Sequence, residues 1–108
     1  MDHTGYLPRL VKMGFKGSIL ATQPTLAIAK IILLDSAKIQ EEYAEKANKE
    51  GFTKHSPAEP LYTIQDAERA IDHFNPLPEG EWITLYPEIK VRFQYNGHII
   101  GATFIELD

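Results

Sequence analysis

A long helical pattern between Gln23 and Glu50 constrains the fold of this chain more than any other feature. Apolar or small side chains recur at every third or fourth position on one face of it: Ile28, Ile32, Ser36, Ile39, Tyr43 and Ala47. Its first half, Leu26 to Leu34, is apolar nearly all round, whereas its second half carries Lys and Glu on the outer faces. We therefore expect one helix that begins in the core and ends in solvent, with the face that contains Ile28, Ile32 and Ile39 buried.

Shorter patterns lie on both sides of this segment. Residues 4–13 and 63–74 have helical spacing, and Thr63 with Asp66 forms a variant of the capping box at the start of the second of these helices. Residues 18–21 form a short apolar run, which is typical of a buried strand.

The last third of the sequence predicts strands. Residues 82–86 are strand-like, and residues 89–95 alternate apolar and polar side chains as a half-buried strand does. Asn96-Gly97 predicts a two-residue type I′ turn into another strand over residues 98–107. The order of elements predicts a mixed α/β fold, with helices on a small mixed sheet that includes a C-terminal β-hairpin.

Composition limits the classes of function. A length of 108 residues with 44% apolar content predicts a single domain over residues 1–108. A net charge of −4 and a pI of about 5.5 do not indicate binding to a polyanion such as a nucleic acid. The absence of cysteine excludes disulfides and thiolate metal sites, and it favours a cytoplasmic protein. The sequence shows neither a signal peptide nor a membrane span.

Two motifs near the ends of the chain carry residues that bind metals. The first is Asp2-His3-Thr4-Gly5-Tyr6-Leu7-Pro8, and the second is Gly97-His98-Ile99-Ile100-Gly101. Carboxylate and imidazole groups are both ligands of zinc in proteins. Together with Gly14-Phe15-Lys16-Gly17 and Ala21-Thr22-Gln23-Pro24-Thr25, and in this order, the motifs resemble the metallo-β-lactamase fold hydrolases of the β-CASP branch, which cut RNA or DNA. The resemblance implies part of an αβ/βα sandwich.

The same resemblance implies a site for two zinc ions. Asp2 and His3 would bind the second zinc, His98 would bind the first, and Asp2 would also accept a proton. Two metals close together can share a hydroxide and hold the phosphodiester oxygen. The His-x-His pair that precedes Asp-His in this family is absent here, and so is the later bridging aspartate, so that the ligand set is incomplete.

These departures lead to two expectations about function. The first is a truncated protein of this family that is catalytically inactive alone and serves as a binding or interaction module. The alternative is a metal-dependent phosphodiesterase or ribonuclease that another subunit or partner chain completes. The question of enzymatic activity is therefore left open by the sequence.

Other readings of the candidate ligands need no zinc. Asp2 and His3 can belong to a poorly ordered terminus. The ring nitrogens of His98 can form hydrogen bonds with water or with carbonyl groups beside a turn. Met1-Asp2-His3 also resembles the amino-terminal motif that binds copper or nickel. For partners, we expect a homo-oligomer formed through an exposed sheet edge, while a nucleic acid is implied by the resemblance only.

Overall fold

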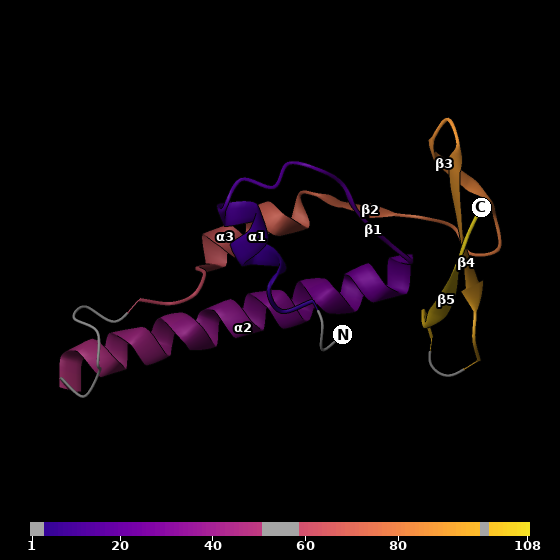
Figure 1. Ribbon diagram of the computed structural model, residues 1–108. Coiled ribbons are helices and arrows are strands. Elements are labelled where there is room, and N and C mark those ends of the chain that lie inside the picture. Colours follow the sequence, from indigo (N-terminus) through magenta and orange to yellow (C-terminus); the bar gives the residue numbers. More distant parts are fainter. Residues whose placement is uncertain (1–3, 51–58, 98–99) are drawn as a thin grey trace. The chain divides into compact units, whose positions relative to one another are not determined.

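The protein is described by a computed structural model that covers residues 4–50, 59–97 and 100–108. Its helices and strands are shown in Figure 1: α1 (Leu7–Lys12), β1 (Ile19–Ala21), α2 (Gln23–Glu50), α3 (Ile64–Ile71), β2 (Phe74–Pro76), β3 (Ile83–Tyr86), β4 (Ile89–Tyr95) and β5 (Thr103–Leu107). The mixed α/β class expected from the sequence is confirmed. These elements form two compact units, Met1–Gly17 with Ala29–His73 and Ser18–Ile28 with Phe74–Asp108.

The first unit is helical and contains α1, α3 and the larger part of α2. Tyr62, which precedes α3, is 1% exposed and its hydroxyl lies 3.1 Å from Ser36 Oγ on α2. The backbone N–H of Ile64 donates to Glu41 Oε2 of the same helix at 3.2 Å. Helices α1 and α3 pack together, and Lys12 Nζ lies 3.8 Å from Asp66 Oδ2 across them. Polar contacts thus fix the start of α3 on α2.

The start of α3 is a full capping box, as the sequence predicts. The Thr63 hydroxyl accepts from the backbone N–H of Asp66, and Asp66 Oδ2 accepts from the backbone N–H of Thr63 at 2.9 Å. Burial raises the pKa of Asp66, but the hydrogen bonds from Thr63 and the charges of Lys12 and Arg69 outweigh it and hold this pKa below its ordinary value. Asp66 is therefore an ionised, buried cap.

The buried face of α2 differs from the one expected. The helix bounds agree with the sequence pattern, but Ile28, Ile32, Ile39 and Tyr43 are 39–64% exposed. Ala47, which the sequence placed on that face, is buried as expected, but the other buried residues of the helix lie elsewhere and are mostly alanines: Leu26, Ala29, Leu33, Ala37 and Ala44. Small side chains allow neighbouring segments to approach the helix closely, and a pattern of large side chains does not reveal them.

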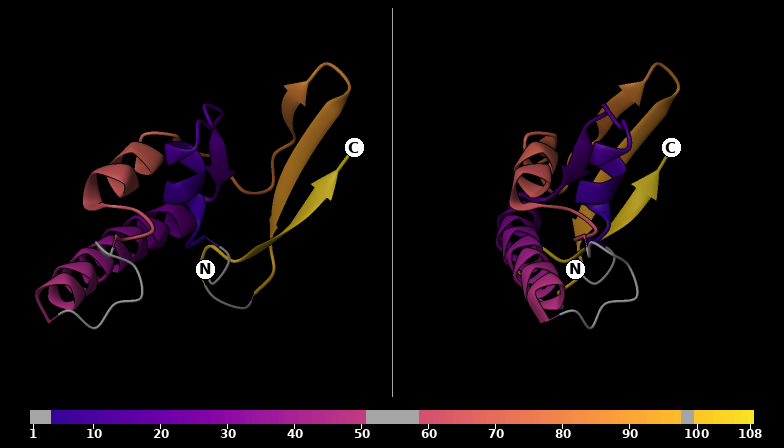
Figure 2. Two further views of the ribbon diagram at one scale, coloured as in Figure 1. Left: turned by 60° about the vertical axis from the view of Figure 1, so that its left-hand side comes forward. Right: turned by 90° about the vertical axis from the view of Figure 1, so that its left-hand side faces the viewer.

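The second unit contains all five strands. Strands β1 and β2 pair in parallel, with Ile19 opposite Phe74 and Ala21 opposite Pro76. Strands β3, β4 and β5 form an antiparallel sheet with β4 in the centre, as both views in Figure 2 show. Val91 and Phe93 of β4 are 5% and 7% exposed and belong to the core. In the described part of the chain the parallel and antiparallel strands therefore belong to two sheets.

In this unit the sequence missed one strand, and one turn prediction is wrong. The sequence did not indicate β2, because three residues that end in proline carry no alternation and look like a helix stop. The C-terminal hairpin is confirmed, but its two-residue type I′ turn is not, since the ladder begins at Tyr95 and Thr103 and Asn96 does not have a positive φ. Seven residues of the sequence, 96–102, separate the two strands instead of two.

None of the helices in the described residues is long and apolar enough to cross a membrane.

Candidate functional site

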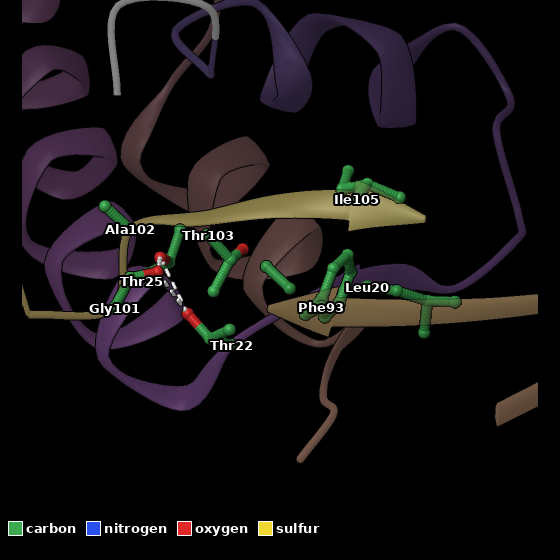
Figure 3. Close-up of a pocket in the computed structure, with 9 residues that line it drawn as sticks. Leu20, Thr22, Thr25, Phe93, Gly101, Ala102, Thr103 and Ile105 are labelled. Atoms are coloured by element: carbon green, nitrogen blue, oxygen red, sulfur yellow. Dashed lines mark hydrogen bonds between the residues drawn. The ribbon is translucent and has the colours of Figure 1, made fainter. Parts of the chain in front are cut away.

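The loop between β4 and β5 is attached to the first turn of α2 by two threonine hydroxyls. Thr22 Oγ1 lies 2.8 Å from the carbonyl oxygen of Gly101, and Thr25 Oγ1 lies 3.0 Å from the same oxygen. The two hydroxyl oxygens are 2.9 Å apart. In Figure 3 both side chains point towards Gly101. We call Thr22, Thr25 and Gly101 the loop anchor.

Each polar group of the loop anchor has a hydrogen-bond partner within it. Thr22 is 1% exposed, so its hydroxyl needs a partner within the protein. Each hydroxyl has one proton, and a carbonyl oxygen has two lone pairs. Thr25 therefore donates to Gly101, while Thr22 donates either to Gly101 or to Thr25, and no group in the triangle is left unpaired.

Only glycine fits at position 101. Its φ is +85°, a conformation that other residues rarely adopt. A Cβ atom there would lie 2.7 Å from Cβ of Pro24 and 3.2 Å from the backbone nitrogen of Thr25. The second glycine of the Gly-His-x-x-Gly motif thus has a structural role, because it lets the loop backbone approach α2.

A pocket of about 290 Å³ lies beside the loop anchor. Leu20, Phe93 and Ile105 give it an apolar wall, as Figure 3 shows. Thr22, Thr25 and Thr103 bring hydroxyl groups to it, and Ala21, Gly101 and Ala102 complete the lining. Among the described residues that line the pocket, no side chain is ionisable.

The charged groups of the C-terminal sheet form a separate cluster. Arg92 of β4 donates to Glu106 Oε2 of β5, directly opposite it, and its guanidinium lies 4.4 Å from the centre of the Trp82 ring. The hydrogen bond from Arg92 holds the pKa of Glu106 below its ordinary value. The arrangement is that of a cross-strand ion pair that stabilises the sheet.

The residues predicted from the sequence to bind metal, Asp2, His3 and His98, lie outside the described residues. Among residues 4–50, 59–97 and 100–108, no group of three or more His, Asp or Glu side chains could hold a metal ion. His73, which lies in the described part, belongs to the helical unit, where its Nδ1 lies 2.8 Å from the carbonyl oxygen of Gly17.

The sequence pattern did not identify Thr22 and Thr25 as partners of the motif glycine. The carbonyl oxygen of Thr22 accepts the first helical hydrogen bond of α2, from the N–H of Leu26 at 3.0 Å. Its hydroxyl, however, contacts a residue 79 positions away in the sequence. The only signal for this contact was the second glycine of the motif, which indicates close backbone approach.

Comparison with known proteins gives relatives for nearly the whole chain. No sequence-family model matches it. It is 30% identical over 105 residues, 97% of its length, to Ribonuclease TTHA0252 of Thermus thermophilus. It is 34% identical over 107 residues to Transcription termination factor FttA of Lokiarchaeum, and 30% identical over 107 residues to FttA of Methanocaldococcus jannaschii.

The chain spans only part of these relatives. The matched region makes up 20% of the ribonuclease and 15% of each of the two termination factors. The loop anchor and both motifs lie in a segment for which these larger proteins have a counterpart. The chain is therefore homologous, over nearly all of its length, to one portion of a ribonuclease and of transcription termination factors.

Proposed function

We propose that the chain is a portion of the metallo-β-lactamase domain of a β-CASP-type nuclease, and that residues 1–108 by themselves are catalytically inactive and act as a binding or interaction module. The proposal is supported by similarity to a protein named as a ribonuclease over 97% of the chain. It is also supported by the two motifs that the resemblance rests on, around His3 and around His98.

The observation that carries the proposal is the loop anchor. Gly101 is held against α2 through its carbonyl oxygen, and only glycine fits there. His98 is three positions earlier in the sequence, so no more than about 11 Å of chain separates it from a fixed point. The anchor thus supplies a physical reason for the spacing of the Gly-His-x-x-Gly motif.

The inactivity of the isolated chain follows from the number of candidate ligands. A catalytic zinc usually takes three protein ligands and a water. In the arrangement that the resemblance implies, Asp2 and His3 serve one zinc and His98 serves the other, so neither position has three ligands from this sequence. The zinc ions of a complete site would supply a hydroxide and hold the phosphodiester; these residues alone do not complete either position.

The alternative function is a metal-dependent phosphodiesterase or ribonuclease that a second chain completes. The loop anchor does not distinguish it from the first function, because Thr22 and Thr25 hold the end of the motif loop in either case. For the alternative function, Asp2, His3 and His98 would be ligands, and the missing ones would come from the partner.

Zinc content and hydrolysis separate these two functions. The purified full chain is incubated with zinc, dialysed, and analysed for bound metal and for cleavage of a single-stranded RNA. We expect far less than one zinc per chain and no cleavage above the protein-free background. Near-stoichiometric zinc that is lost in Asp2→Ala, His3→Ala and His98→Ala but kept in the control His73→Ala, at the histidine that contacts Gly17, would overturn this and favour the alternative.

A further inference from the structure

We draw no further inference here: the strongest candidate, the pocket of about 290 Å³ beside the loop anchor with its apolar wall of Leu20, Phe93 and Ile105, belongs to the site already described, and nothing in the structure shows what covers that wall.

Discussion

At the scale of single residues, the loop anchor depends on a glycine for two separable reasons. Gly97 and Gly101 bound the same loop and have similar φ values, +77° and +85°. A Cβ at Gly97 would meet nothing within 4 Å, whereas one at Gly101 would collide with Pro24. A substitution at Gly97 therefore measures the cost of backbone strain alone, and the same substitution at Gly101 measures backbone strain together with steric overlap.

We expect Gly97→Ala to lower the free energy of unfolding by about 1–2 kcal/mol, the cost of left-handed backbone. Gly101→Ala should cost roughly 1–3 kcal/mol more, because the added methyl also overpacks the contact with α2. Urea unfolding followed by the fluorescence of the single Trp82 gives both values. Equal losses in the two variants would show that Gly101 is not held against the helix.

The partners of this glycine could not be predicted from the sequence. The motif indicates where a backbone approaches something closely, but not what it approaches. Thr22 and Thr25 precede it by 79 and 76 positions, and nothing in the intervening pattern specifies that separation. The carbonyl of Thr22 makes a local bond, to the N–H of Leu26, while its hydroxyl makes the long-range contact with Gly101.

At the scale of elements, α2 shows what a periodic pattern can and cannot establish. The first and last residues of the helix can be predicted, because apolar side chains recur at helical spacing along all of it and a glycine, Gly51, comes next in the sequence. The buried face does not, because isoleucine dominates a hydrophobic pattern and alanine contributes little to it. The core side of α2 is lined by alanines around Leu33, which is 0% exposed, and Ile39 is 57% exposed.

A matched pair of truncations distinguishes these two faces. Leu33→Ala should cost about 2–5 kcal/mol of unfolding free energy, the usual loss for a buried leucine. Ile39→Ala should change it by no more than about 0.5 kcal/mol, as for most surface positions. Thermal or urea unfolding of the two variants measures both changes. If the face expected from the sequence were the buried one, Ile39→Ala would cost more unfolding free energy than Leu33→Ala.

The cap of α3 makes stability depend on pH. The folded pKa of Asp66 lies below its ordinary, unfolded value of 3.8, so its contribution is fully present above that value. It is lost as the pH falls towards the folded pKa, because the protonated carboxyl no longer pairs with Lys12 and Arg69.

We expect Asp66→Asn to be less stable than the unchanged chain at pH 7, by an amount that shrinks as the pH falls below about 4. Removing the cap from the other side, by Thr63→Ala, should cost about 1 kcal/mol and reduce the same pH dependence. Unfolding free energies from urea titrations at several pH values test both. A difference between Asp66→Asn and the unchanged chain that grows towards low pH would contradict the assignment.

At the scale of the whole molecule, the sequence predicts ancestry better than it predicts chemistry. The ordered motifs from Asp2 to Gly101 lie in a chain that is similar, over nearly all of its length, to one portion of a ribonuclease and of transcription termination factors. The mixed α/β class follows from the order of elements, which local periodicity establishes. A metal site requires residues from distant segments to meet, and no local pattern specifies that meeting for Asp2, His3 and His98.

Net charge leads to a prediction for the whole molecule about nucleic acids. With a net charge of −4, the chain has no overall excess of the cations that supply non-specific affinity for polyanions. We expect fluorescence anisotropy of a labelled single-stranded RNA to show a Kd weaker than about 100 µM at pH 7.5 and about 50 mM salt.

The matched variant for this measurement changes charge on exposed positions of α2. Glu42 and Glu45 are both exposed there, and replacing each by lysine brings the formal net charge from −4 to zero. Binding that appears only in this double variant, and weakens as salt is added, is the expected result, because it arises from phosphate contacts alone. If the unchanged chain binds RNA tightly and the binding persists at high salt, the prediction is wrong, because such binding requires specific contacts beyond those to phosphate.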